Sequence, residues 1–196
     1  MDSEAIVAMV AGLRAGDTAA FDAVHAAFNG RLFTFLMRLS RRREVAEDLL
    51  EETWLRLVAH AHRLRPDTQL APWLFTVARN LWISHQRARA FEDSQASGLL
   101  GLWPSGHSHP SPFEEAAVNE AGRRIEAALN SLPSTYREVL LLVGVEEFRP
   151  IEAAAICGIT PEAFRQRLSR ARTMLAERLN GSEEAATAAA LGEVWP

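Results

Sequence analysis

Acidic side chains gather on one side of a helix predicted between about residues 44 and 64. At about 3.6 residues per turn they fall within an arc of about 140°, and apolar side chains occupy the opposite side. These acids are Glu44, Glu47, Asp48, Glu51 and Glu52. The pattern fits either a solvated charged face or a surface that docks a basic protein partner. A surface of this charge repels DNA, so DNA has to approach the molecule elsewhere.

The next predicted helix, residues 71–90, combines basic and aromatic side chains. Its arginines are Arg79, Arg87 and Arg89, and no acidic residue occurs between positions 76 and 91. Trp73, Phe75 and Trp82 lie along the same helix, and Asn80 stands near its middle. Cations beside aromatic rings, with an amide that bonds a base edge, suit single-stranded DNA. The alternative interpretation places at least two of the three rings in the core.

The most specific local pattern lies between residues 150 and 178. A short helix with small side chains leads to Gly158, and Thr160 then caps a longer, arginine-rich helix. This is the layout of a helix-turn-helix. The side chains expected to face outward are Arg165, Gln166, Ser169 and Arg170, with Arg172 at the margin. These groups can read base edges or hold phosphates, and the alternative is a solvated charged helix in a small bundle.

Helices are expected to position all of these residues, because apolar side chains recur at helical spacing and no strand pattern occurs. The predicted fold class is all-α, with two small helical domains joined by a flexible linker. The first domain spans residues 1–90, a linker rich in Ser, Gly and Pro spans 91–113, and the second domain spans 114–180. An acidic tail follows at 181–196. The apolar island Leu99–Trp103 inside the linker is expected to dock on another surface, and the alternative is a short satellite packing element.

Local signals set the expected helix ends. Gly16 ends a first helix, Asp17 or Thr18 caps a second, and Gly30 is expected to interrupt that second helix. In the second domain, Pro133 opens a helix, and the arginine-rich helix is expected to run as far as Asn180.

Composition argues against several classes of protein. The chain has 196 residues, a formal net charge of −4, 48% hydrophobic residues and one cysteine, Cys157. Wholesale disorder, a disulfide scaffold, a zinc cluster and a membrane span are not expected. No catalytic motif or phosphate loop occurs, and His107 and His109 are expected to be inert, so we expect no enzyme activity, cofactor, metal or small-molecule substrate. The expected location is the cytoplasm.

Three segments of the first half read AFDAVHAAFNGRLFTFLMRL, AEDLLEETWLRL and PWLFTVARNLWISHQR. They resemble region 2 of bacterial RNA polymerase sigma factors of the extracytoplasmic-function (ECF) class. Region 4 of the same family resembles a segment of the second half, LPSTYREVLLLVGVEEFRPIEAAAICGITPEAFRQRLSRARTML. The order of the two regions and the linker between them also match, and the resemblance covers about residues 18–180.

The resemblance implies a protein that binds core RNA polymerase and directs promoter-specific transcription initiation. Region 2 would dock its acidic helix on the coiled coil of the largest polymerase subunit. The implied docking residues are Glu47, Asp48, Glu51 and Glu52. Region 2 would also melt the minus-ten element and capture a flipped base at Asn80, inside a pocket formed by the loop Leu64–Leu70. The implied minus-ten residues are Leu64, Arg65, Trp73, Arg79, Asn80 and Arg87.

Region 4 would place the arginine-rich helix in the major groove of the minus-thirty-five element. The implied contacts are Arg165, Gln166, Ser169, Arg170 and Arg172. Members of this class are usually held inactive by an anti-sigma factor, which is a further expected partner.

Several positions depart from the family pattern. Glu51 replaces a frequent Gln, Ser84 replaces a frequent Asp, and PEAFRQRL replaces the usual start of the recognition helix, which suggests a shifted base preference. Two alternatives therefore stay open. A decoy would bind an anti-sigma factor and never DNA, in line with the net charge of −4. A plain helix-turn-helix regulator would leave the acidic helix unexplained.

Overall fold

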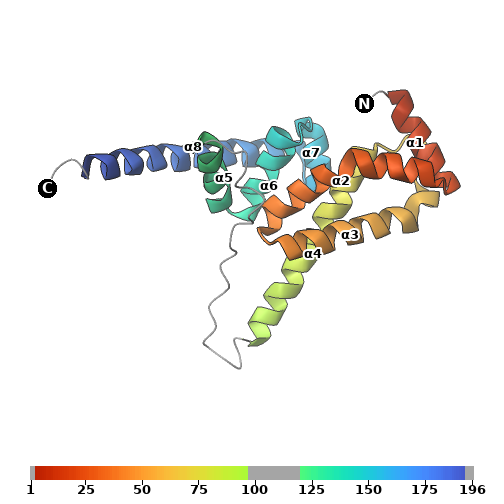
Figure 1. Cartoon of the computed structure of the whole chain (residues 1–196), viewed down its shortest axis with the longest axis horizontal. Coiled ribbons are helices and arrows are strands. Elements are labelled where there is room, and N and C mark those ends of the chain that lie inside the picture. The colour runs from red at the N-terminus through yellow and green to blue at the C-terminus, as the bar shows by residue number, and fades with distance from the viewer. Residues whose placement is uncertain (1–2, 97–119, 193–196) are drawn as a thin grey trace. The chain divides into compact units, whose positions relative to one another are not determined.

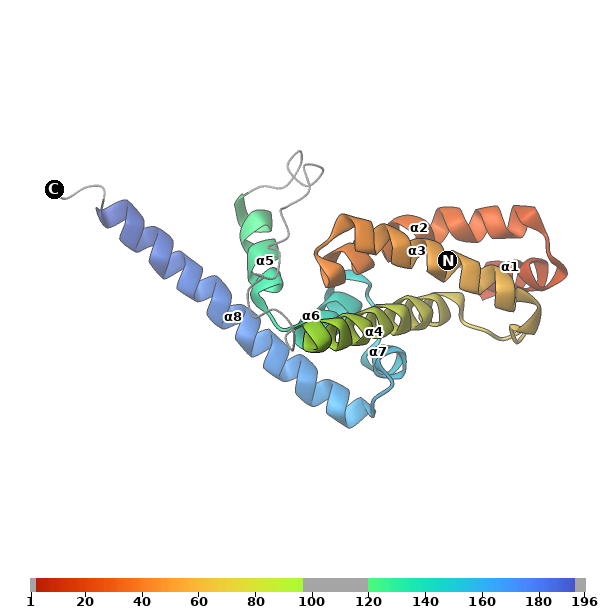
Figure 2. The same ribbon diagram turned by 90° about the horizontal axis from the view of Figure 1, so that it is seen from below.

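Every element that the computed structural model describes, over residues 3–96 and 120–192, is helical, which confirms the predicted all-α class. Residues 1–109 and 110–196 form two compact units. Figures 1 and 2 label the helices of both units in chain order. The apolar island Leu99–Trp103 and the two linker histidines lie outside the described residues. The expected boundaries of the linker stay predictions.

The first unit contains four α-helices and a short 3-10 turn among its described residues. They are α1 (Ser3–Ala15), α2 (Thr18–Ser40), α3 (Arg43–His60), η1 (Ala61–Arg63) and α4 (Leu70–Ala96). Gly16, at a φ of 75°, ends α1, and the Asp17 carboxylate caps α2 by accepting from Ala19 N at 2.9 Å. Gly12 lets α1 approach α2 closely, because a Cβ added there would lie 2.5 Å from the Cβ of Ala20.

The central helix of this unit is α2, which packs against α1, α3 and α4. Its buried side chains recur at helical spacing, so one stripe of the helix faces the core. They are Val24, Phe28, Leu32, Phe35, Leu36 and Leu39. The rings of Phe35 and Phe75 lie 5.1 Å apart, which joins α2 to α4. Because α3 and α4 also pack against each other, both are held in fixed positions within the unit.

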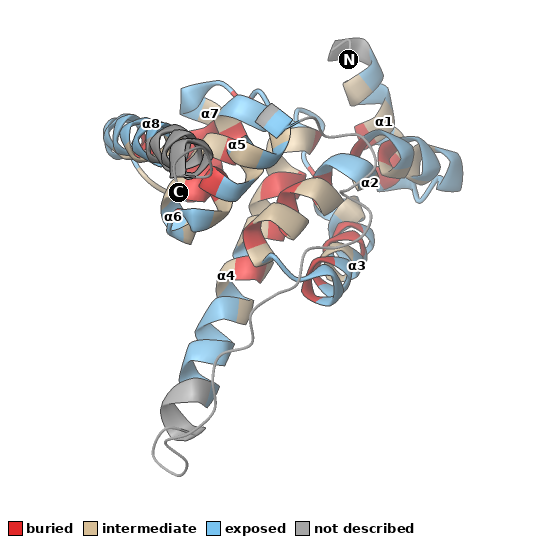
Figure 3. Ribbon diagram, turned by 60° about the vertical axis from the view of Figure 1, so that its left-hand side comes forward, coloured by how far each residue is buried: buried red, intermediate tan, exposed pale blue. Residues whose placement is uncertain are grey.

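Two helices of the first unit differ from the sequence-based prediction. α2 runs through Gly30 without interruption, and no atom lies within 4 Å of a Cβ added there. α4 continues to Ala96, beyond the end predicted at residue 90. Figure 3 shows that its final turns with described side chains are exposed. A solvated helix end lacks the apolar spacing that marks a packed helix, so the pattern did not predict it.

The second unit contains α5 (Glu120–Ser131), α6 (Ser134–Leu140), a π-helical turn η3 (Leu141–Val145), α7 (Pro150–Cys157) and α8 (Pro161–Gly192). Phe164 of α8 and Leu142 of η3 are fully buried, and α7 contributes small buried alanines. α8 continues past Asn180 through most of the segment that the sequence assigned to a tail.

One buried arginine ties α5 to α6. Arg137 is only 4% exposed. Its guanidinium donates to the main-chain oxygens of Leu129, Asn130 and Leu132 at 2.8 to 3.0 Å. These carbonyls lie at and just beyond the C-terminal end of α5, where the last carbonyls lack intrahelical α-helical donors and the helix dipole favours a cation. Arg137 therefore fixes the connection that leads toward the helix-turn-helix.

Candidate functional site

The outer face of α3 carries the predicted acidic surface. Glu44, Glu47, Asp48 and Glu51 are exposed, and Glu52 has intermediate exposure. The opposite face of the helix is buried within the first unit. Its side chains are Val45, Ala46, Leu49, Thr53, Trp54 and Leu57. Burial of one face leaves the carboxylates of the other accessible to a second protein.

The acids of this face differ in whether an arginine already neutralises them. Glu47 accepts a hydrogen bond from Arg43 Nε at 2.7 Å, one turn earlier. Glu52 forms the same pairing, also at 2.7 Å, with an arginine one turn later. Asp48 and Glu51 have no hydrogen-bond or ion-pair partner among the residues that the structure describes. The strongest uncompensated charge on α3 therefore lies at Asp48 and Glu51.

An open pocket of about 400 Å³ lies between α3 and α4. It is lined from α4 by Trp73, Val77, Asn80, Leu81 and Ser84, and from α3 by Arg56 and His60. The structure thus brings together two of the residues singled out from sequence, Trp73 and Asn80. Trp73 is half-buried and Asn80 is exposed. An aromatic ring and an amide in one pocket suit an unstacked base, which is held by stacking and by hydrogen bonds to its edge.

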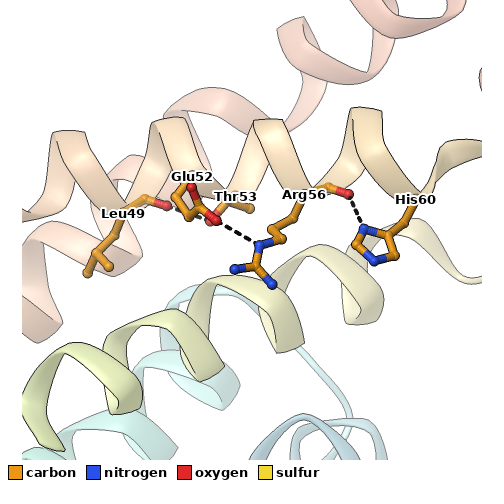
Figure 4. A network of polar contacts seen from close by, with 5 residues as sticks. All are labelled: Leu49, Glu52, Thr53, Arg56 and His60. Carbon is orange, nitrogen blue, oxygen red and sulfur yellow. Dashed lines mark hydrogen bonds and ion pairs between the residues drawn. The ribbon is translucent and has the colours of Figure 1, made fainter. Parts of the chain in front are cut away.

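Arg56 and His60 supply the α3 side of this pocket, and neither was predicted as a site residue from the sequence. Figure 4 shows them in one line along α3 with Glu52. Arg56 Nε donates to Glu52 Oε1 at 2.7 Å, and His60 Nδ1 lies 2.9 Å from the main-chain oxygen of Arg56. The signal that could have found them is their spacing, because Arg56 lies four residues after Glu52 and His60 four residues after Arg56, which places all three on one edge of the helix.

The other residues expected to contact the minus-ten element do not line this pocket. Leu64 is buried at the start of the loop before α4, and Arg65 is exposed and pairs with an aspartate two residues later. Arg79 is half-buried, and its Nη1 donates to Asn80 Oδ1 at 3.5 Å. Arg87 is exposed on the second half of α4. Their contacts with DNA stay predictions.

A histidine in α4 adds no charge to this basic helix at neutral pH. The ring of His85 stacks on that of Trp82, with centroids 6.0 Å apart. Burial, followed by the nearby Arg89 and Arg42, lowers the pKa of His85 below its usual value. The positive potential of α4 therefore comes from its arginines.

The predicted helix-turn-helix is formed by α7, Gly158 and α8. Gly158 has a φ of 63°, in the left-handed region that glycine adopts without strain, and its amide bonds to Ala155 O at 3.1 Å. Thr160 Oγ1 accepts from Ala163 N at 3.2 Å and so caps α8 as predicted. Pro161 occupies the first position of α8.

The side chains of α8 separate into the two predicted faces. Phe164, Leu168 and Ala171 are buried. The candidate DNA-reading residues Arg165, Gln166, Ser169, Arg170 and Arg172 are all exposed. The guanidinium of Arg165 approaches a glutamate three residues earlier at 3.4 Å, whereas Arg170 has no such partner in the described part of the chain.

Other kinds of site find no support in the described residues. No group of three or more His, Cys, Asp or Glu side chains there is arranged to hold a metal ion. Within the same ranges no helix is long and apolar enough to cross a membrane. Cys157 is buried in α7.

Comparison with known proteins assigns both halves of the chain. The family model of Sigma-70 region 2 matches residues 25–92, and that of Sigma-70, region 4 matches residues 122–175. The ECF RNA polymerase sigma factor EcfG of Rhodopseudomonas palustris (strain TIE-1) is 37% identical over 159 residues, covering 78% of this chain and 82% of that relative. The chain belongs to the ECF RNA polymerase sigma factors. The family and function expected from sequence are confirmed.

Two further comparisons agree with this assignment of the sigma factor. The ECF RNA polymerase sigma factor SigM of Bacillus subtilis (strain 168) is 30% identical, covering 79% of this chain and 91% of SigM. The solved structure of the sigma factor RpoE in complex with the anti-sigma factor NepR from Bartonella quintana is 31% identical, with a TM-score of 0.68. That match covers 82% of this chain and 96% of the RpoE chain.

As an ECF sigma factor, the chain directs transcription initiation and has no enzyme activity of its own. Its partners as a member of the family are RNA polymerase and DNA. Region 2 contains the acidic face of α3 and the pocket between α3 and α4, and region 4 contains the exposed face of α8 as far as Arg172. The two departures in region 2 lie on these surfaces, since Glu51 belongs to the acidic face and Ser84 lines the pocket.

Proposed function

We propose that the sigma factor docks on core RNA polymerase through the carboxylates of α3. The observation that carries this proposal is the exposure of Asp48 and Glu51, neither of which has a hydrogen-bond or ion-pair partner among the described residues. Solvated carboxylates of this kind attract a basic surface and bond to its cations on contact. Glu47 and Glu52 border them and extend the docking surface along α3.

The pocket between α3 and α4 captures one flipped base of the melted minus-ten element. Trp73 offers a ring face for stacking, and Asn80 offers an amide that reads the base edge. Arg79 and Arg87 bind phosphates of the separated strand along α4. Leu64 and Arg65 belong to the loop that leads into this helix, and they guide the strand toward the pocket.

The exposed face of α8 reads the minus-thirty-five element in the major groove. The proposed contacts are Arg165, Gln166, Ser169, Arg170 and Arg172. Arginine forms bidentate bonds to guanine, and Gln forms them to adenine, so both residue types supply base specificity. Arg170 is the best placed of the arginines to do so, because no carboxylate in the described residues competes for its guanidinium.

An anti-sigma factor regulates the sigma factor by occupying the acidic surface of α3. Support comes from the related RpoE chain, whose structure was solved with the anti-sigma factor NepR. A regulator on α3 and core polymerase would exclude each other. Binding of the anti-sigma factor and binding of core polymerase both take place in the cytoplasm, where polymerase and promoter DNA meet.

Run-off transcription with core polymerase tests this function as a whole. Templates are taken upstream of genes that are induced when the sigma factor is overproduced. We expect transcripts with one defined start in the presence of the chain, and none with Asp48→Arg. Asp22→Arg, at an exposed acid on α2, is the matched control and retains activity.

The decoy alternative predicts a different result in the same assay. A chain that only sequesters an anti-sigma factor would never form a complex with core polymerase and would give no transcript on any of these templates. That result would overturn the docking and base-capture proposals together.

A further inference from the structure

Besides the indole of Trp73, four polar side chains line the pocket between α3 and α4. Asn80 and Ser84 stand on the α4 side, and Arg56 and His60 stand on the α3 side. Arg56 Nε is bonded to Glu52, which leaves the other N–H groups of the guanidinium available as donors. The role of His60 depends on which of its two ring nitrogens carries the proton.

The main-chain oxygen of Arg56 settles that choice. It lies 2.9 Å from His60 Nδ1, and a carbonyl oxygen only accepts hydrogen bonds. Nδ1 must therefore carry the proton, and the Nε2 atom of the uncharged ring is a bare acceptor. Figure 4 shows the ring extending from α3 on the side that faces α4. Nε2 has no protein partner among the described residues, so it is available to a ligand.

We propose that His60 determines the identity of the captured base by accepting a hydrogen bond from an exocyclic amine. Cytosine carries such an amine at C4, and adenine carries one at C6. Thymine and guanine carry a carbonyl oxygen at these positions, and an oxygen there would face the lone pair of Nε2. The pocket therefore selects amino bases over keto bases, while Arg56 donates to a neighbouring acceptor on the same base edge.

This inference rests on the proposed capture of a base in the pocket, and it adds a specificity residue to that role. Trp73 stacks on any base, since every base has an aromatic face, so stacking alone does not discriminate between bases. The Asn80 amide has both a donor and an acceptor and accommodates either kind of edge. The Ser84 hydroxyl likewise donates and accepts, so among the four polar side chains only His60 offers an acceptor and no donor to the pocket.

A selection experiment tests the inference and works for a promoter of any sequence. Holoenzyme, assembled from core polymerase and the full chain, captures templates from a pool that is melted in advance and randomised through the melted segment. Sequencing before and after capture gives the base preference at each position. We expect one position enriched about 5- to 10-fold in adenine or cytosine, the discrimination that one good hydrogen bond supplies.

Substitutions at His60 should change that position alone. His60→Leu removes the acceptor and flattens the preference, and His60→Lys replaces it by a donor and shifts the preference toward thymine or guanine. His62→Leu, at an exposed histidine of η1 that does not line the pocket, leaves the preference unchanged. The inference is overturned if His60→Leu keeps the preference for amino bases, or if the wild-type chain enriches keto bases there.

Asn80→Ala separates this inference from the proposal on which it rests. If it lowers capture while His60→Leu leaves the base preference unchanged, base capture stands and the role of His60 is wrong. If no position is enriched with the wild-type chain and Asn80→Ala captures as well, both are wrong.

Discussion

The carboxylates on the outer face of α3 differ in whether a basic partner must first displace an arginine in order to bind them. Glu47 and Glu52 already accept hydrogen bonds from arginines of their own helix, whereas Asp48 and Glu51 form no hydrogen bond or ion pair within the described structure. Exposed pairs of this kind contribute little to stability, but they neutralise charge at the surface. A basic partner has to displace an arginine to bind Glu47 or Glu52, whereas no arginine has to be displaced from Asp48 or Glu51.

Asp48→Asn and Glu51→Gln should therefore weaken the complex with core polymerase more than Glu47→Gln and Glu52→Gln. We expect about a 10-fold loss of affinity for each of the first two, or about 1.4 kcal/mol, and about half that free energy for each of the others. Titration of labelled sigma factor with core polymerase, followed by fluorescence anisotropy, measures all four. Equal losses at the four positions would contradict the importance of pairing.

Arg170 provides the corresponding test at the DNA surface of α8. Arg170→Ala should lower affinity for the minus-thirty-five duplex by about 1 to 3 kcal/mol if its guanidinium bonds a base in the major groove. Arg178→Ala is the matched control, because that exposed arginine lies more than two turns farther along α8, beyond the end of the region 4 match. An electrophoretic mobility-shift assay compares the two. Similar affinities for both variants would place Arg170 outside the interface.

Among the helical elements, those with a packed face were predictable and those without one were not. The exposed acidic face of α3 and the exposed face of α8 could be predicted from the sequence, because each lies opposite a stripe of apolar residues at helical spacing. The last turns of α4 have no such stripe and were assigned to the linker. The pocket was only half predicted, since the chemistry of Trp73 and Asn80 is evident in the sequence, whereas the place of His60 depends on how α3 packs against α4.

Two glycines show how packing decides the effect of the same substitution on the first unit. Gly12→Ala should destabilise it by about 1 to 3 kcal/mol, because the new methyl group meets Ala20 of α2. Gly30→Ala should stabilise it by about 0.5 to 1 kcal/mol, because space is open there and alanine favours a helix. Urea unfolding, followed by the fluorescence of the buried Trp54 and Trp82, reports this unit. Shifts of the same sign would contradict this explanation.

In the molecule as a whole, acidic and basic side chains lie on separate surfaces. Region 2 presents carboxylates on the outer face of α3, and arginines with an aromatic pocket along α4, while region 4 presents arginines on α8. The net charge of −4 therefore hides local surfaces that suit both a basic protein and a polyanion. Which surface suits which partner depends on these local charges and could not be inferred from the overall charge of the sigma factor.

Region 2 is proposed to bind polymerase through one surface and to melt the promoter through another. This separation is tested most directly by comparing Asp48→Arg with Asn80→Ala. Both variants are mixed with core polymerase and a promoter template, and polymerase binding and promoter melting are measured in the same samples, melting by the reactivity of thymines to permanganate. Asp48→Arg should lose polymerase binding and therefore melting. Asn80→Ala should bind polymerase as the wild-type chain does and melt the promoter poorly. Normal polymerase binding by Asp48→Arg, or loss of binding by Asn80→Ala, would contradict the separation of the two surfaces.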